Sequence, residues 1–122
     1  MQRLFALRGA HSVERNDADS ILAATDELLR ELMARNPLTP DSLVSAIFTV
    51  TDDLDAQFPA VAARNLGLNQ VPLLCAREIP VPGSLPRIVR ILMHYYAPED
   101  HRPNHAYLGE ARALRADLEA AQ

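Results

Sequence analysis

Lysine and tryptophan are absent from this sequence, and cysteine occurs once, as Cys75. A single cysteine cannot build a disulfide framework or a four-cysteine metal site within one chain. The four glycines, at positions 9, 67, 83 and 109, are too few and too scattered for a dinucleotide fingerprint or a phosphate-binding loop. These absences argue against redox chemistry and against nucleotide-dependent chemistry of those two types.

Long apolar runs are also missing. No segment approaches the roughly 18 uncharged residues that a membrane helix needs. The apolar residues 4–7 lie between Arg3 and Arg8, so they form a stretch shorter than the roughly 7–15-residue core of a signal peptide. We therefore expect a cytoplasmic protein with no membrane partner.

The charged residues comprise 16 acidic and 12 basic side chains, for a formal net charge of −4, and every basic residue is arginine. An excess of negative charge argues against an electrostatic footprint for nucleic acid. The arginine bias has two explanations that the sequence leaves open: the composition of the source genome, or selection for ion pairs with several hydrogen bonds. With 122 residues, of which 48% are hydrophobic, the chain is long enough for one domain, 1–122, with its own core.

The order of apolar and turn-forming residues predicts strands interleaved with helices. Apolar residues at helical spacing follow Asn16 or Asp17, either of which can cap a helix, and Pro37 ends it. A second helix is predicted from Pro59, closed by Gly67. Strands are expected at residues 3–8 (ended by Gly9), 44–51, 71–76, 87–96 and 106–108, before a charged, alanine-rich tail at about 110–122. The pattern indicates an α+β domain with a small mixed sheet and two main helices.

Histidine and cysteine give little support for a metal site or a nucleophile. His101 and His105 are four residues apart, as on a metal-binding helix, but Pro103 between them would disrupt the helix. Cys75 has no histidine near it in sequence to activate its thiol, and we interpret both Cys75 and His94 as residues in or beside the core. We expect neither a metal nor a cofactor.

Arg90 is the strongest candidate for a function because it lies inside the apolar run Ile88–Met93. A buried charge is costly unless an opposite charge pairs with it. Two interpretations are open: an internal salt bridge to Glu78, at the end of the preceding strand, or an external anion. Arg8 also ends an apolar strand, so two guanidiniums and one carboxylate would project from strand ends, which suits a small, multiply charged organic anion.

Short motifs follow one another along almost the whole chain. They are Arg8-Gly9-Ala10, Val13-Glu14-Arg15, Thr51-Asp52-Asp53-Leu54, Phe58-Pro59-Ala60, Val71-Pro72-Leu73-Leu74-Cys75-Ala76-Arg77-Glu78, Ile88-Val89-Arg90, His105-Ala106-Tyr107-Leu108 and Leu114-Arg115-Ala116-Asp117-Leu118. In this order and spacing, the sequence resembles the monofunctional chorismate mutases of the AroH class. It departs from that pattern at Val61, where the family often has lysine, and at Leu74, where it often has threonine. Both departures bear on affinity more than on activity.

The resemblance implies a homotrimer with a pseudo-α/β-barrel and three active sites in clefts between neighbouring chains. Members of that family convert chorismate to prephenate, on the way to phenylalanine and tyrosine. This is a pericyclic Claisen rearrangement that needs no cofactor, metal or covalent intermediate. The lack of a nucleotide loop and of a metal cluster in the sequence agrees with that chemistry.

The resemblance also assigns roles to individual residues. Arg90 would donate hydrogen bonds to the ether oxygen and to a carboxylate, while Arg8 and Tyr107 would hold a carboxylate. Glu78 and the main chain of Cys75 would contact the ring hydroxyl and select a compact conformer. The other substrate-binding residues would be Phe58, Ala60, Leu73, Leu74, Arg64 and, in a mobile C-terminal tail, Leu114 and Arg115. The catalytic set would be Arg90, Glu78 and Arg8.

Two other classes of protein would also place arginine at a subunit interface. One is a small trimer that hydrolyses reactive imines or enamines. The other is a non-catalytic trimeric module that binds an anionic metabolite. The pair Arg90 and Glu78, together with Tyr107, favours the mutase.

Overall fold

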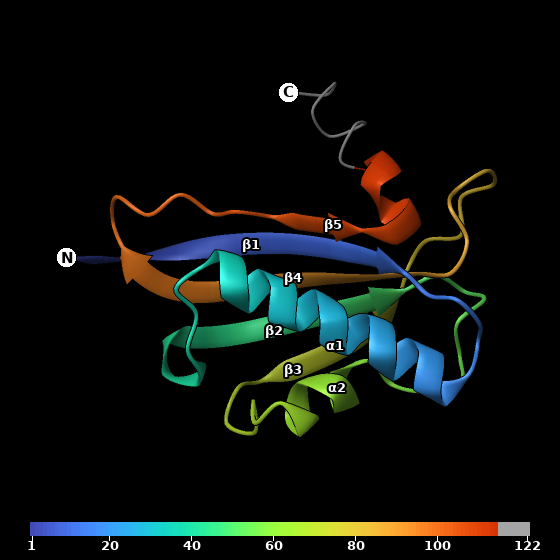
Figure 1. Ribbon diagram of the computed structural model, residues 1–122, viewed down its shortest axis with the longest axis horizontal. Helices are drawn as coiled ribbons and strands as arrows, with labels where there is room; N and C mark the ends of the chain where they lie inside the picture. Colours follow the sequence, from blue (N-terminus) through green and yellow to red (C-terminus); the bar gives the residue numbers. More distant parts are fainter. Residues whose placement is uncertain (115–122) are drawn as a thin grey trace.

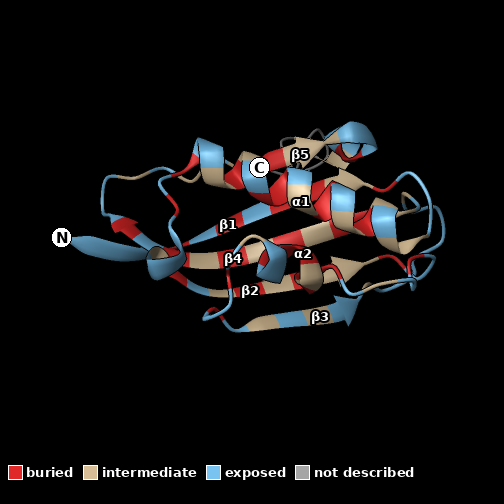
Figure 2. Cartoon of the chain, turned by 60° about the horizontal axis from the view of Figure 1, so that its bottom comes forward, coloured by how far each residue is buried: buried red, intermediate tan, exposed pale blue. Residues whose placement is uncertain are grey.

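The computed structural model describes residues 1–114 and shows a five-stranded sheet with two helices lying over one of its faces (Figure 1, Figure 2). Its elements, in chain order, are β1 (Gln2–Ser12), α1 (Ala18–Arg35), the 3₁₀ turn η1 (Pro40–Ser42), β2 (Leu43–Val50), α2 (Ala60–Asn65), β3 (Leu73–Arg77), β4 (Ile88–Pro98), β5 (Ala106–Leu108) and the 3₁₀ turn η2 (Gly109–Ala111). The α+β class is confirmed.

The sheet has the strand order β3-β2-β4-β1-β5, so the long strand β4 lies at its centre. β4 runs antiparallel to both β1 and β2, whereas β3 is parallel to β2 and β5 is parallel to β1. Parallel neighbours need a crossover connection, and α2 lies in the connection from β2 to β3. The sheet is therefore mixed, as predicted.

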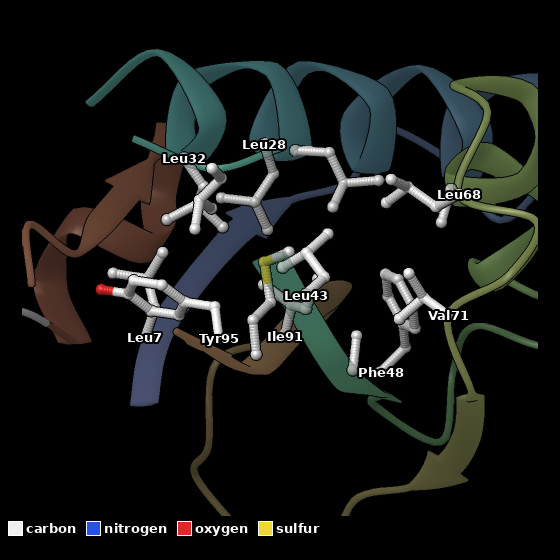
Figure 3. Packing of buried hydrophobic residues seen from close by; sticks show 14 of the residues in the cluster. Leu7, Leu28, Leu32, Leu43, Phe48, Leu68, Val71, Ile91 and Tyr95 are labelled. Atoms are coloured by element: carbon white, nitrogen blue, oxygen red, sulfur yellow. The ribbon is translucent and has the colours of Figure 1, made fainter. Parts of the chain in front are cut away.

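The long helix α1 begins where the sequence indicated. The Asp17 side chain accepts a hydrogen bond from the main-chain N–H of Ser20 at 2.7 Å, and this bond lowers the pKa of the Asp17 carboxyl. The helix ends at Arg35, two residues before Pro37. Its buried leucines meet the sheet in one core cluster (Figure 3), which includes Leu28, Leu32, Leu7, Phe48, Ile91 and Tyr95.

Gly9 does not end the first strand, contrary to the sequence prediction. β1 continues to Ser12, and Gly9 pairs with Ile91 of β4 and with Ala106 of β5. A Cβ atom at Gly9 would lie 3.0 Å from methyl carbons of both Leu28 and Leu32. The close packing of α1 against β1, and not a turn of the chain, is thus what favours glycine here.

We expect Gly9→Ala to destabilise the protein. The added methyl group would push against two leucines that are already fully buried, and overpacking of this kind costs about 1–3 kcal/mol. Chemical denaturation should therefore show a lower free energy of unfolding with an unchanged denaturant dependence. An unaltered midpoint would mean that α1 can move away from the strand at no cost.

Other element boundaries differ more modestly from the predictions. β3 begins at Leu73, two residues later than predicted, because Pro72 has no N–H to donate to the ladder; Val71 is buried in the core before the strand starts. α2 has only 6 residues, so α1 is the one long helix among the described residues. Residues 88–98 form a strand, close to the 87–96 predicted, and Gly67, with a φ of 92°, follows α2 as predicted.

The predicted tail is described only in part. Residues 109–111 form η2 and residues 112–114 continue as a helical turn. The remainder of the tail, including Arg115, lies outside the described residues. None of the helices within residues 1–114 combines the length and the apolar composition needed to cross a membrane.

Candidate active site

Arg90 forms the internal ion pair that the sequence left open. Its Nε donates to Oε2 of Glu78 at 2.9 Å, and the hydroxyl of Thr49 donates to the same oxygen at 2.8 Å. Glu78 follows β3 and its main-chain N–H donates to the carbonyl of Val50 at 2.9 Å, which fixes the carboxylate beside β2. The carboxylate therefore has two donors and a rigid attachment to the sheet.

The ion pair leaves much of the Arg90 guanidinium available. The Arg90 side chain is 43% exposed, whereas that of Glu78 is 16% exposed. Within residues 1–114 only Nε of this guanidinium donates a hydrogen bond, so both terminal nitrogens can meet a ligand. Internal pairing and anion binding are thus compatible in Arg90, because they use different nitrogens.

Arg8 lies beside Arg90 on the sheet. Arg8 is opposite Leu92 of β4, and Ala10, two residues later on the same face of β1, is opposite Arg90 itself. The alternating residues Phe5 and Leu7 are buried beneath α1, so Arg8 points to the face of the sheet away from the helices. The prediction that Arg8 ends its strand was wrong: it is in the middle of β1, and the two arginines come from a sheet face and not from strand ends.

A hollow of about 250 Å³ opens on this face. It is lined by residues of β1, β2, β4 and β5, namely Arg8, Gly9, Ala10, Ile47, Thr49, Arg90, Ile91, Leu92 and Tyr107. Tyr107 reaches it because β5 pairs with β1 and places Tyr107 opposite Ala10. Two guanidiniums and a phenol that converge on an otherwise apolar hollow can bind a small organic anion.

The remaining predicted site residues are dispersed. Phe58 and Cys75 line a separate hollow of about 360 Å³ beside the start of α2. Leu74 is exposed on the same sheet face as Arg8, in a row with Ile47 and Leu92. The others lie as follows: Arg64 is exposed on α2, Ala60 is buried in the core, Leu73 packs against the core, and Leu114 packs against the small cluster of Ala10, Ile88 and Ala111.

The start of β4 is held by a strained turn that the sequence analysis missed. Arg87 has a φ of 49°, a conformation that costs free energy for any residue with a side chain. Its main-chain N–H donates to both carboxylate oxygens of Asp53, at 3.2 and 3.0 Å. Thr51 accepts from the N–H of Ile88 at 3.1 Å and donates to Asp53. The motif at residues 51–54 therefore fixes the chain three residues before Arg90.

We expect Asp53→Ala to lower both stability and activity. The substitution removes the acceptors of the Arg87 N–H, at a cost of roughly 1 kcal/mol, and frees the strained turn to relax and shift the start of β4. The matched control is Asp52→Ala, which removes an adjacent exposed carboxylate. Thermal melts and steady-state rates should separate the two variants, and equal behaviour would show that the turn does not position Arg90.

Comparison with known proteins agrees with the resemblance seen in the motifs. Residues 4–118 match the family described as chorismate mutase type I. The chain is 50% identical over 119 residues to the chorismate mutase AroH of Thermus thermophilus, across 95% of this chain and 97% of that protein. It is 37% identical over 115 residues to chorismate mutase AroH of Bacillus subtilis strain 168, across 92% of this chain and 90% of that protein.

A solved structure shares the fold. A chorismate mutase from Clostridium thermocellum superposes with a TM-score of 0.85 at 46% sequence identity, covering 89% of this chain and 98% of that chain. The mixed sheet, the hollow with its two arginines and these likenesses together define an isomerase. The chain belongs to the type I chorismate mutase family.

Proposed function

We propose that the protein rearranges chorismate to prephenate, a step toward phenylalanine and tyrosine, in a site that a neighbouring copy of the chain completes. The observation that carries the proposal is the hollow at which Arg8, Arg90 and Tyr107 converge, with Glu78 paired to Arg90. Chorismate carries two carboxylates, an ether oxygen and a ring hydroxyl, and these residues offer a partner for each kind of group.

Arg90 acts on the bond that breaks. As the carbon–oxygen bond lengthens and the new carbon–carbon bond forms, negative charge builds up on the ether oxygen. A terminal nitrogen of Arg90 donates to that oxygen, while the bond from Nε to Glu78 keeps the guanidinium plane fixed. A donor held in place before the reaction stabilises the transition state without reorganisation, and this is electrostatic catalysis.

The other groups select the reactive shape of the substrate. Arg8 and Tyr107 bind a carboxylate from two neighbouring strands. Glu78 accepts a hydrogen bond from the ring hydroxyl, which the main chain of Cys75 also contacts. Binding both ends holds the two reacting carbons near each other, which removes much of the entropic part of the barrier. No proton transfer and no covalent intermediate is required.

The incomplete site is the argument for a neighbouring chain. Arg8 and Arg90 lie at one hollow, whereas Phe58 and Cys75 line another beside α2, so the described part of one chain does not enclose a substrate. Phe58 is 67% exposed, which is unusual for a phenylalanine in a monomer. Bringing Phe58 of one copy over the arginines of the next would cover the aromatic ring and close the site.

An apolar sheet face supports the assembly. The side of the sheet opposite α1 and α2 presents Leu4, Tyr96 and Leu74, which are 46%, 48% and 60% exposed. An uncovered sheet face is normally polar, and an apolar one marks an interaction surface. We therefore propose a homotrimer with a shared pseudo-α/β-barrel, and, on the sequence grounds given above, a location in the cytoplasm.

The reaction is tested by following chorismate with the purified protein. We expect its ultraviolet absorbance to disappear and proton NMR to show prephenate as the product, with a metal chelator present and no nucleotide added. A flat absorbance trace at high protein concentration would eliminate the mutase. Ammonia release from an imine substrate would instead favour the hydrolytic trimer, and chorismate binding without turnover would favour the binding module.

A further inference from the structure

The main chain of Arg8 is held by a histidine that lies 97 residues further along the sequence. The parallel ladder between β1 and β5 begins at Gly9 and Ala106, so it does not reach Arg8. The N–H of Arg8 instead donates to Nδ1 of His105 at 3.0 Å. The imidazole thus extends the sheet by one hydrogen bond at the residue that faces the arginine hollow.

The histidine is itself anchored to the end of α1. The carbonyl of His105 accepts from Nη1 of Arg35 at 2.8 Å. Asn36, the residue after the helix, donates to the carbonyl of Asn104 at 3.0 Å and accepts from the N–H of Asn104 at 2.9 Å. Asn36 is 4% exposed and also donates to the carbonyl of Leu32, so its side chain is held firmly in place. The main chain of Asn104 and His105, from which the imidazole extends, is therefore fixed to the end of α1.

Only a neutral imidazole can make this contact. An acceptor at Nδ1 requires a lone pair there, so the ring proton must be on Nε2. Protonation would turn Nδ1 into a donor that faces another donor, and it would add a positive charge beside Arg8 from β1 and near Arg35 from α1, whose own charge is paired with Glu31. The contact breaks when His105 gains a proton.

Burial, and after it the positive charge of Arg8, lowers the pKa of His105 below its ordinary value. The neutral form consequently persists to lower pH in the folded protein than in the unfolded chain. The stability that depends on it is complete above the ordinary pKa of histidine and declines as the pH falls from there toward the lowered value. The contact should be intact at neutral pH and lost in acid.

We propose that His105 is a positioning residue for substrate binding: through Nδ1 it fixes the main chain of Arg8, and so the guanidinium that holds a substrate carboxylate. The proposal rests on the proposed function, because that is where Arg8 receives its ligand. It goes further in making the affinity of the site depend on the protonation of a group that does not touch the substrate.

Three variants separate this role from a merely structural one. His105→Phe keeps a ring but removes the acceptor, and His105→Asn puts an uncharged acceptor near the place of Nδ1. The control is His11→Asn, which removes a histidine of β1 whose ring pairs with Glu27 of α1, on the other face of the sheet from the arginine hollow. We expect His105→Phe to raise KM for chorismate about tenfold, the equivalent of one ordinary hydrogen bond, with little change in kcat. His105→Asn should restore KM, and His11→Asn should not alter it.

The pH profile gives the sharper result. The KM of the unaltered protein should stay constant down to the ordinary pKa of histidine, about 6.5, and rise at lower pH, as the pH approaches the lowered pKa of His105. This rise should be smaller in His105→Asn, which has no imidazole to protonate, and should remain in His11→Asn. Identical profiles for all three proteins, or an unchanged KM in His105→Phe, would overturn the proposal.

A spectroscopic measurement tests the contact without any turnover. Long-range proton–nitrogen NMR spectra, with the His105 signals assigned by their absence in His105→Asn, should show a ring protonated at Nε2 and bare at Nδ1. The ring should also titrate at a pH below that of an unfolded histidine. A proton on Nδ1 at neutral pH would refute the contact even if the protein rearranges chorismate, whereas a bare Nδ1 in a protein without that activity would count against the proposed function alone.

Discussion

Replacing Arg90 by methionine is expected to lower kcat about a hundred- to thousandfold, which corresponds to roughly 2.7–4 kcal/mol of transition-state stabilisation. Methionine fills much of the same space but has no charge and no donor. The ether oxygen becomes negative only as its bond breaks, so the loss should appear in kcat more than in KM. Steady-state kinetics with chorismate measure both constants directly.

Two further variants define what Arg90 contributes. Lysine restores the positive charge without the planar fork, so Arg90→Lys should have an activity between those of arginine and methionine at this position. Arg64→Met is the matched control, because Arg64 is an exposed arginine of α2 that is assigned to substrate binding and not to the catalytic set. It should raise KM with a modest change in kcat. A KM defect alone in Arg90→Met would mean that the catalytic charge belongs to another arginine.

Two inactive variants are expected to restore each other when they are assembled together. Arg90→Met removes the catalytic charge from the arginine hollow. Phe58→Asp places a carboxylate where Phe58 is proposed to cover the arginines of the next chain, and this carboxylate repels a dianionic substrate. If each site combines the arginines of one chain with Phe58 of the next, a trimer that contains both variants has about a third of its sites with both halves intact. Each variant alone has none.

Co-expression of the two variants under different tags provides the mixed assembly. After purification through both tags, the rate with chorismate should be far above that of either variant prepared alone. The control is the double variant Arg90→Met with Phe58→Asp, co-expressed with the unaltered chain and purified through both tags, for which about a sixth of the sites are intact. Mixed variants with no more activity than their parents would show that both residues act within one chain.

The sequence predicted the elements that local signals determine. α1 follows from leucines at helical spacing between Asp17 and Pro37, and β4 from an apolar run rich in Ile, Val and Tyr. The prediction that Gly9 ends the first strand was wrong because glycine is favoured there by the close approach of α1, a contact between segments that are distant in sequence. The limits of β1 could not be found without knowing that contact.

In the candidate site, too, local signals predicted some features, whereas contacts between distant segments left no signal in the sequence. Arg90 could be singled out because a charge inside an apolar run needs a partner. The geometry supports both interpretations offered for it, since Nε pairs with Glu78 while the side chain remains partly exposed. His105 could not be identified, since its spacing to His101 suggested only a metal site that Pro103 excluded. Its partner is a main-chain N–H on another strand, which leaves no pattern in the sequence.

Size-exclusion chromatography with light scattering and an activity assay on every fraction tests most directly whether neighbouring chains build the site. We predict that the mutase activity elutes with a species of three chains, each of 13.5 kDa, and that it falls on dilution only as this species dissociates. A stable species of one chain that retains full turnover of chorismate would contradict the shared site.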